Sequence, residues 1–214
     1  MTKRITKVYI DTPLVFNVIK RERLLWADSL KVLRAAERGE IKLVASTLLM
    51  AEVIGWRGDV EPAVRNDAID RYLQNLIEWV ELDLFVIREA LMLGDRLRLR
   101  GPDASHLATA IRQKVDYFMS RDGAFPYATT VDGVSIVEPS IVWEPSFDDW
   151  EIDRQAEEEE ERLQAAEVEE RAAQVSGLVR GRDISSGRDL RESEQPGARN
   201  GTAKSNSVSS VGDA

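Results

Sequence analysis

The stretch KVYIDTPLVF, Lys7–Phe16, contains the pattern that decides the fold: an apolar strand, an acid at its end and the start of a helix. The letters KVYI predict a short buried strand. Pro13 stands where the first turn of a helix tolerates a residue without a backbone N–H, and the apolar pattern continues through Phe16 and Ile19. Asp11 is therefore expected directly after the carboxyl end of a strand.

The same alternation of strand and helix continues along the chain. We expect further strands over residues 41–45, 79–82, 116–119 and 134–137, and further helices over residues 24–39, 61–78, 86–100 and 103–114. Ser46 or Thr47 can cap one more helix, which carries Glu52. Strands that alternate with helices predict an α/β protein whose central parallel sheet is covered on both faces.

The composition changes near residue 146 and again near residue 176. We predict a body over residues 1–145, an acidic helical extension over 146–175 and a disordered Ser/Gly/Arg-containing tail over 176–214. From Glu151 onward the chain holds 15 acidic and 9 basic residues, so this segment supplies most of the net charge of -9. The body is nearly balanced in charge, and the overall acidity does not argue against a nucleic-acid partner.

Composition also excludes several kinds of site. The chain has no cysteine, which excludes disulfides, thiolate metal sites and cysteine nucleophiles, and its single histidine, His106, excludes a multi-histidine zinc site. No apolar run approaches the length of a membrane span, and the first residues lack the apolar core of a signal peptide. We expect a cytoplasmic protein without a membrane partner.

Four acids stand at the edges of apolar elements. Asp11 ends the first strand, Asp122 follows a later strand in YFMSRDG, and Asp103 begins a helix in GPDASHLATAI. Glu52 lies in the apolar run LLMAEVIGW. Because ligands of open parallel sheets bind beyond the carboxyl ends of the strands, these carboxylates are candidates for one shared site.

Each acid also has a simpler explanation. Asp11 is compatible with a turn at a strand end, Asp103 with a helix N-cap and Asp122 with an ordinary Asp-Gly turn. A buried unpaired carboxylate is costly, so Glu52 needs either a functional site or a cationic partner. Among the nearby cations, the candidates for that partner are Arg57 and Lys42.

A cluster of carboxylates makes chemical sense with a hard divalent cation. Carboxylate oxygens suit Mg²⁺ or Mn²⁺, and without a cation their mutual repulsion would force some of them to protonate. Such an ion lowers the pKa of water and neutralises charge on a phosphodiester, so hydrolysis needs no nucleophile from the protein. That chemistry agrees with a chain that lacks cysteine.

The ordered segments VYIDTPLVF, STLLMAEV, PDASHLATAI and DYFMSRDGAF resemble the PIN-domain ribonucleases, particularly the VapC-like toxins of type II toxin–antitoxin pairs. The resemblance covers roughly residues 8–137. It implies a three-layer α/β/α fold with a central parallel sheet, and Mg²⁺- or Mn²⁺-dependent cleavage of RNA. The acidic ligands of the family fall on Asp11, Glu52, Asp103 and Asp122. A cognate antitoxin and a homodimer are further implications, and the tail is not part of the usual compact domain.

Other polar residues are candidates for substrate contacts or for support of the acids. Ser120, where the family commonly has Thr or Ser, could hydrogen-bond a ligand or a phosphate. Arg96, Arg98 and Arg100 lead into the Asp103 segment and could bind RNA phosphates, although cations are also favoured at a helix C-terminus. Lys20, Arg21 and Arg23 form a second basic patch. His106 is expected to be a core or supporting hydrogen-bonding residue.

The resemblance, together with the four acids, therefore implies an endoribonuclease in which four carboxylates hold Mg²⁺ or Mn²⁺ and activate water against RNA. An alternative keeps the fold but uses it as a non-catalytic, regulatory RNA- or protein-binding module. Metal binding without turnover would favour that alternative.

Overall fold

A computed structural model describes residues 4–56, 58 and 60–183. The strands in this part of the chain are β1 (Thr6–Ile10), β2 (Ile41–Ser46), β3 (Ile77–Val80), β4 (Tyr117–Met119), β5 (Thr129–Val131) and β6 (Val134–Val137). The helices are α1 (Thr12–Ile19), α2 (Trp26–Glu37), α3 (Thr47–Gly55), α4 (Pro62–Ala68), the π-helix η1 (Ile69–Leu73), α5 (Gln74–Leu76), α6 (Leu84–Leu97), α7 (Gly101–Arg112) and α8 (Phe147–Asp183).

The strands of the described chain form one six-stranded sheet in the order β3-β2-β1-β4-β6-β5. All neighbouring pairs are parallel except β5 and β6, which are antiparallel. From β1 the chain first builds outward through β2 and β3, and later returns to the other side of β1 with β4. The order reverses between β1 and β4, and in an open α/β sheet such a switch point is where ligands bind.

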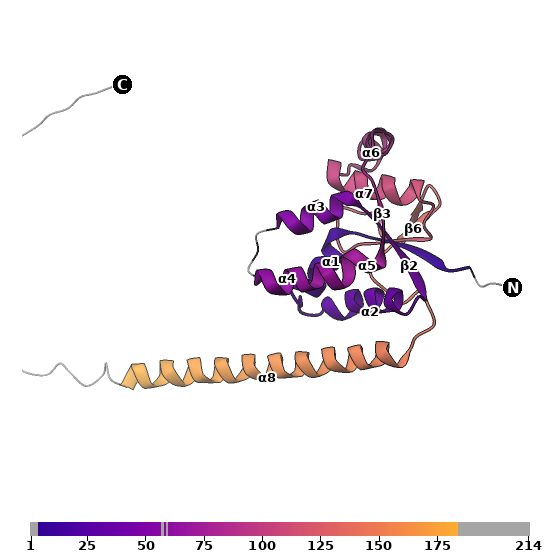
Figure 1. Ribbon diagram of the computed structural model, residues 1–214. Helices are drawn as coiled ribbons and strands as arrows, with labels where there is room; N and C mark the ends of the chain where they lie inside the picture. The colour runs from indigo at the N-terminus through magenta and orange to yellow at the C-terminus, as the bar shows by residue number, and fades with distance from the viewer. Residues whose placement is uncertain (1–3, 57, 59, 184–214) are drawn as a thin grey trace, which may run out of the picture. The chain divides into compact units, whose positions relative to one another are not determined.

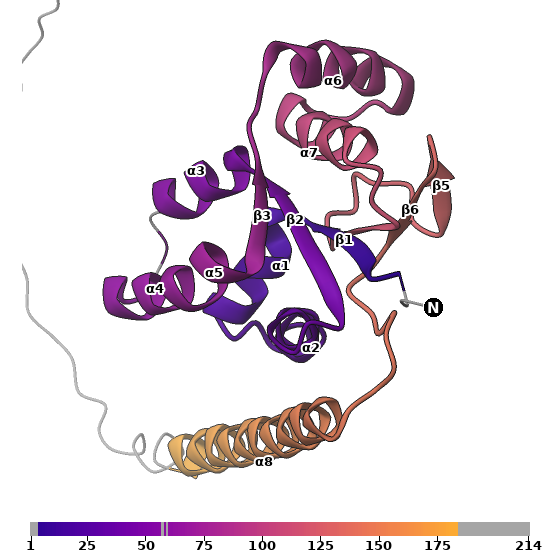
Figure 2. The same cartoon turned by 45° about the vertical axis from the view of Figure 1, so that its right-hand side comes forward.

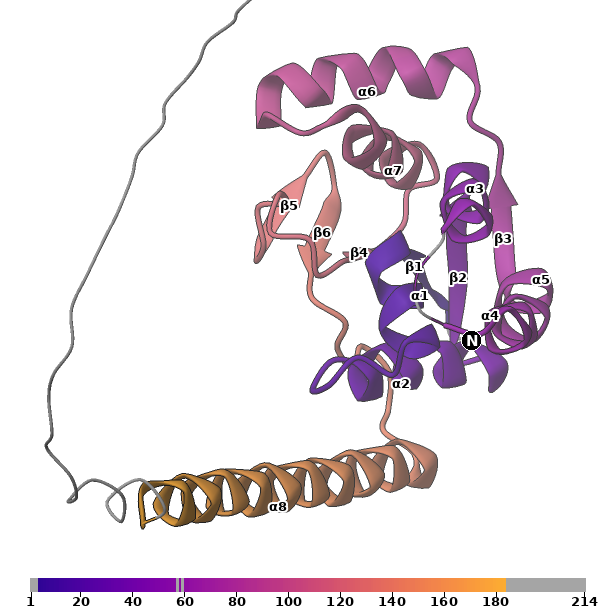
Figure 3. The ribbon, with the colours of Figure 1, turned by 90° about the vertical axis from the view of Figure 1, so that its left-hand side faces the viewer.

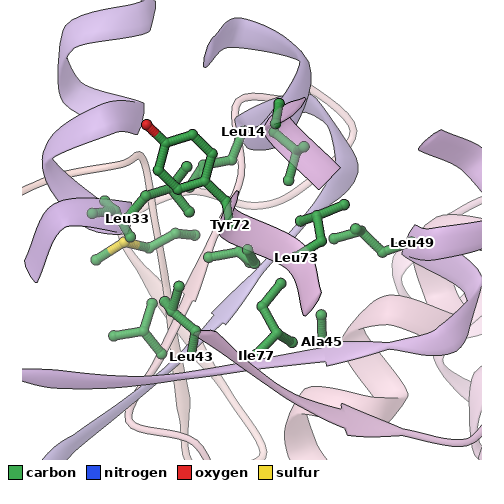
Figure 4. Packing of buried hydrophobic residues seen from close by; sticks show 14 of the residues in the cluster. Leu14, Leu33, Leu43, Ala45, Leu49, Tyr72, Leu73 and Ile77 are labelled. Carbon is green, nitrogen blue, oxygen red and sulfur yellow. The ribbon is translucent and has the colours of Figure 1, made fainter. Parts of the chain in front are cut away.

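Alternation along β1 places side chains on two faces of the sheet. Val8 and Ile10 belong to one buried apolar cluster, whereas Tyr9 belongs to the other. The first cluster joins the sheet to α1, α2, α3, α4 and η1, and Figure 4 shows Leu14, Leu43 and Leu73 within it. The second cluster joins the opposite face to α6 and α7. The core therefore has two apolar layers, one on each side of the sheet.

The helices accordingly lie on both sides of the strands. Figures 1 and 2 show α6 and α7 on one side of the sheet and α1, α2, α4 and α5 on the other. Seen from a third direction, β5 and β6 form a hairpin beside α7 (Figure 3). This arrangement confirms the predicted three-layer α/β/α fold with a mostly parallel central sheet.

Two elements differ from the expectation. The helix predicted over residues 61–78 ends earlier, and β3 begins at Ile77 instead of Trp79, because Ile77 pairs with Leu43 in the ladder with β2 and is buried there. The antiparallel strand β5 was not predicted. Two of its three residues are exposed, so it lacks the apolar pattern that identifies a buried strand.

The acidic extension forms a helix, as predicted, but α8 continues to Asp183 instead of ending near residue 175. The boundary predicted near residue 175 therefore lies inside α8, and the tail from residue 184 onward lies outside the described residues. The chain divides into two compact units, Met1–Ala166 and Glu167–Ala214, so the first unit includes the start of α8. No helix in the described residues is both long enough and apolar enough to span a membrane.

Candidate active site

The switch point brings the end of β1 beside the end of β4. Ile10 pairs with Met119, and the backbone N–H of Asp11 donates to the carbonyl of Met119 over 3.2 Å. The next residue after β4 is Ser120, and Asp122 follows two positions later. Sequence positions 109 residues apart thus become neighbours at the carboxyl edge of the sheet.

Asp11 is the buried carboxylate of this edge. It caps α1, accepting a hydrogen bond from the backbone N–H of Thr12 at 2.8 Å, and it accepts a second from the Ser120 hydroxyl at 2.8 Å. Its residue surface is only 4% exposed. Burial raises the pKa of Asp11, although hydrogen bonds and the nearby His106 partly offset that rise. An ionised Asp11 is therefore costly, as is common for a carboxylate at a functional site.

Glu52 reaches the same point from α3, whose first turn is capped by Ser46. Its carboxylate accepts hydrogen bonds from the Thr12 hydroxyl and from Nε2 of His106, the latter over 3.2 Å. Burial would raise the pKa of Glu52, but these hydrogen bonds outweigh it and leave the pKa below its ordinary value. Glu52 is therefore ionised at neutral pH.

The partner of Glu52 is not the lysine considered from the sequence. Lys42 instead forms an ion pair with Glu78 over 2.7 Å, and the other candidate, Arg57, lies outside the described residues. The apolar run around Glu52 had suggested full burial, yet its side chain is 31% exposed. Its carboxylate thus lies at the rim of the site, within reach of solvent.

His106 lies between the two carboxylates. It follows Asp103 by three positions on α7 and is 1% exposed. Its Nε2 is 3.2 Å from Oε2 of Glu52 and 3.6 Å from Oδ1 of Asp11, and its Nδ1 is 2.8 Å from the Tyr9 hydroxyl. The histidine is therefore a direct partner of two candidate ligands, consistent with the supporting role expected for it.

Asp103 and Asp122 form a second pair of acids. Burial raises the pKa of Asp103, and the negative charge of Asp122 raises it further. Asp122 is oriented by its turn, in which its backbone N–H donates to the Ser120 hydroxyl and its carboxylate accepts from the Ala124 N–H. The alternative of Asp103 as an N-cap is wrong, since α7 begins at Gly101 with Arg100 as its N-cap. Asp103 instead lies in the first turn, where the helix dipole stabilises a negative charge.

The structure thus groups the four acids as two pairs, and His106 contributes electrostatically to Asp11, Glu52 and Asp103. Within the described residues, no three side chains of His, Asp or Glu converge closely enough to form a metal-ligand group. The acids lie at the same edge of the sheet, but the described residues do not form a complete set of ligands around one ion.

The arginines considered for RNA differ in their surroundings. Arg96 forms an ion pair with Asp132, while Arg98 adopts a left-handed backbone conformation at the end of α6. Arg100 lies next to Asp103 and lowers its pKa, so among these three it is the one linked to the acids. In the second basic patch, Arg21 and Arg23 form ion pairs with glutamates of α8.

Two residues of the site were missed in the sequence. Thr12 donates its hydroxyl hydrogen to Glu52, and Tyr9 contacts His106. Thr12 could have been found, because a hydroxyl directly after a strand-end acid lies at the same sheet edge. Tyr9 gives no such signal, since an aromatic residue inside a strand is most simply read as core.

The fold and the acids define a class of protein. It is an α/β protein whose sheet is covered by helices on both faces and carries acidic side chains at its switch point. The chain belongs to the PIN domain family, whose model matches residues 8–129. No curated protein matches the chain.

Solved structures also resemble the chain at low identity. One is VapBC2 from Rickettsia felis bound to a DNA fragment from its promoter, with 12% identity and a TM-score of 0.46 over 65% of this chain and 100% of that chain. Another is a toxin–antitoxin complex from Klebsiella pneumoniae, with 18% identity and a TM-score of 0.42 over 63% of this chain and 99% of that one.

Proposed function

We propose that the protein is a metal-dependent endoribonuclease, the VapC-like toxin of a toxin–antitoxin pair, that hydrolyses RNA phosphodiester bonds. The observation that carries the proposal is the meeting of Asp11 and Glu52 at the switch point of the sheet, with Asp103 and Asp122 as a coupled second pair. Membership of the PIN domain family supports the same reading.

The donors fit a hard divalent cation by their chemistry. All four are carboxylates, and oxygen ligands are those that Mg²⁺ and Mn²⁺ prefer. The pKa values of Asp11 and Asp103 are raised, chiefly by burial, which a positive charge nearby would counteract. When bound, the cation would supply a water of lowered pKa and neutralise charge on the phosphodiester. Asp11, Glu52, Asp103 and Asp122 are the residues that would hold it.

The remaining polar groups would serve the substrate and the ligands. Ser120 fixes the carboxylate of Asp11 and the turn of Asp122, so it organises both acid pairs from one hydroxyl. Arg100, beside Asp103, is the candidate for a phosphate contact near the acids. Arg96 and Arg98 would contact other phosphates of the bound RNA. The protein would act in the cytoplasm, as a homodimer neutralised by a cognate antitoxin.

The deciding experiment is cleavage of a panel of RNAs by the purified protein with Mg²⁺ or Mn²⁺, against EDTA. Glu52→Gln should abolish cleavage, because it removes a charged ligand while keeping the size of the side chain. Glu89→Gln is the matched control, since Glu89 lies on α6 and pairs with Arg112 away from the acids. Cleavage that persists in EDTA or in Glu52→Gln would contradict the proposal.

One observation favours the alternative of a non-catalytic RNA- or protein-binding module. The described residues contain no closed group of three metal-ligating side chains. If the RNA-binding form of this alternative holds, RNA binds without being cut, and Glu52→Gln retains the RNA affinity of the unaltered protein; if the protein-binding form holds, neither protein cuts RNA. Measurement of binding and cleavage on the same RNAs separates the two functions.

A further inference from the structure

The imidazole of His106 has a partner at each of its nitrogens. Nδ1 lies 2.8 Å from the hydroxyl of Tyr9, and Nε2 faces Glu52 and Asp11 at 3.2 and 3.6 Å. The ring belongs to α7, Tyr9 to β1 and Glu52 to α3, so the contacts connect three elements. With 1% of its surface exposed, the ring is fixed by these contacts and by packing.

Tyr9 is itself held in place. Its hydroxyl accepts a hydrogen bond from the backbone N–H of Ser46 at 3.0 Å, and its ring stacks on Phe118 with 5.3 Å between the ring centroids. Tyr9 is fully buried, and its hydroxyl lies within hydrogen-bond distance of both the Ser46 backbone and His106. The hydroxyl therefore anchors His106 to the end of β2.

The direction of the hydrogen bond at Nε2 follows from its acceptor. A carboxylate oxygen accepts hydrogen bonds, so the contact of 3.2 Å between Nε2 and Oε2 of Glu52 is a hydrogen bond when Nε2 carries the hydrogen. The Tyr9 hydroxyl then donates to Nδ1 of the neutral ring. The nearest oxygen of Asp11 lies 3.6 Å from Nε2, beyond hydrogen-bond distance, and interacts with it electrostatically.

We propose that His106 is a positioning residue whose Nε2–H draws the carboxylates of Glu52 and Asp11 to one point, with Tyr9 setting the orientation of the ring. The inference rests on the proposed function, in which those carboxylates hold a divalent cation. Without this donor the two carboxylates repel each other, and the partly exposed Glu52 keeps the Thr12 hydroxyl as its hydrogen-bond donor but loses the contact that links it to the side of Asp11. Loss of a group that orients metal ligands typically weakens metal affinity about 10- to 100-fold.

The single histidine makes the first test direct. Nitrogen-15 NMR of the full-length, metal-free protein reports both imidazole nitrogens of His106 without overlap from another histidine. A hydrogen on Nε2 is expected, both before and after Mg²⁺ is added. A bare Nε2 in the metal-free protein overturns the inference. Loss of the Nε2 hydrogen on adding Mg²⁺ also overturns it, because His106 would then be a ligand.

The second test measures Mn²⁺ affinity by electron paramagnetic resonance of the free ion, which requires no turnover. His106→Leu should weaken Mn²⁺ binding about 10- to 100-fold, because it keeps an apolar side chain of similar bulk but has no donor. His106→Gln should restore most of the affinity, since its amide nitrogen can donate from nearly the same place as Nε2. Equal affinity of His106→Leu and the unaltered protein would overturn the inference.

Two tyrosine variants test the orientation of His106 without replacing the histidine itself. Tyr9→Phe should lower Mn²⁺ affinity and shift the Nδ1 resonance, since it removes only the hydroxyl that orients the ring. Tyr72→Phe, in the apolar cluster on the opposite face, should change neither. If Tyr9→Phe changes neither, the inference fails. If the unaltered protein binds no Mn²⁺, the proposed metal site fails, while the NMR result still decides whether Nε2 donates to the carboxylates.

Discussion

Two buried aspartates show how different surroundings shift the pKa of the same side chain in opposite directions. Asp11 accepts bonds from Thr12 and Ser120, yet burial still raises its pKa. Asp149 is also buried, with none of its surface exposed, but its pKa is lowered, because hydrogen bonds from Ser146, Trp143 and Arg38 outweigh the effect of burial. A carboxylate that is kept despite a raised pKa suggests a function, whereas a fully satisfied one suggests structure.

The lowered pKa of Asp149 makes its contribution to stability depend on pH. A carboxylate whose pKa is lower when folded stabilises the protein above its unfolded pKa, about 3.9, and loses that effect as the pH falls through its folded pKa. Asp149→Asn should lower the free energy of unfolding by about 2 kcal/mol at pH 7. The difference from the unaltered protein should shrink below about pH 4. Urea unfolding at several pH values measures it, and a difference that does not change with pH would contradict this role.

At the scale of the element, the start of α8 is attached to α2 by both apolar and ionic contacts. Ile152 packs against Trp26 and Ala27, and the buried Lys31 forms an ion pair with Asp153 over 2.6 Å. The carboxylate of Asp149 accepts a hydrogen bond from the backbone N–H of Ser146 at 2.9 Å and closes the first turn of the helix, as one half of a capping box does. The first residues of this acidic helix are therefore part of the first compact unit.

The apolar contact of α8 can be tested by a pair of truncations. Ile152→Ala should lower the free energy of unfolding by about 2–3 kcal/mol, because it removes buried methyl groups and leaves a cavity. Val168→Ala is the control on the same helix and should have almost no effect, since Val168 is 67% exposed. Urea unfolding measures both, and equal effects of the two substitutions would show that Ile152 is not packed in solution.

The end of α6 gives a prediction about a candidate RNA contact. Arg98 has a φ of 59°, in the left-handed region that favours glycine. Arg98→Gly should therefore stabilise the fold by about 0.5–1 kcal/mol. Arg96→Gly should destabilise it by about 1 kcal/mol, because it places glycine inside a helix.

Thermal unfolding measures the two effects, and RNA affinity of the same variants tests the side chains as phosphate contacts. Destabilisation by Arg98→Gly would contradict the left-handed conformation. Unchanged RNA affinity of the folded Arg98→Gly variant would remove Arg98 from the RNA surface.

At the scale of the whole molecule, α6 presents an apolar face to solvent. Leu84, Phe85, Leu91 and Met92 are each more than 60% exposed, and their spacing places them along one side of the helix. Isolated exposed apolar residues are common, whereas several on one side of a helix are typical of a protein–protein interface. We assign this face to the proposed homodimer.

Light scattering after size-exclusion chromatography tests the assignment. The unaltered protein should have the mass of a dimer, and Leu91→Glu with Met92→Glu should give a folded monomer, because two charges would be buried at the interface. Val64→Glu, on α4, is the control at another exposed apolar position and should remain dimeric. A monomeric unaltered protein would contradict the dimer and leave the face for another partner, such as the antitoxin.

Much of the fold could be read from short segments, because local periodicity determines most helices and buried strands. The segment around Asp11 predicted both β1 and α1, and β6 was predicted with the same residues that the structure shows. Local hydrophobic patterns did not predict the strands whose formation depends on pairing with a strand distant in the sequence. Ile77 joined β3 through its contact with β2, and β5 formed as the exposed partner of β6.

The candidate site shows the same division. Which acids follow strands or begin helices could be inferred from the sequence alone, and with them the fold class and the resemblance to the family. Only the tertiary structure decided that Thr12 and His106 are the partners of Glu52, because those contacts join residues 40 and 54 positions apart. Local patterns depend on neighbours within a turn or a strand, whereas a site depends on side chains that the packed sheet brings together from distant segments.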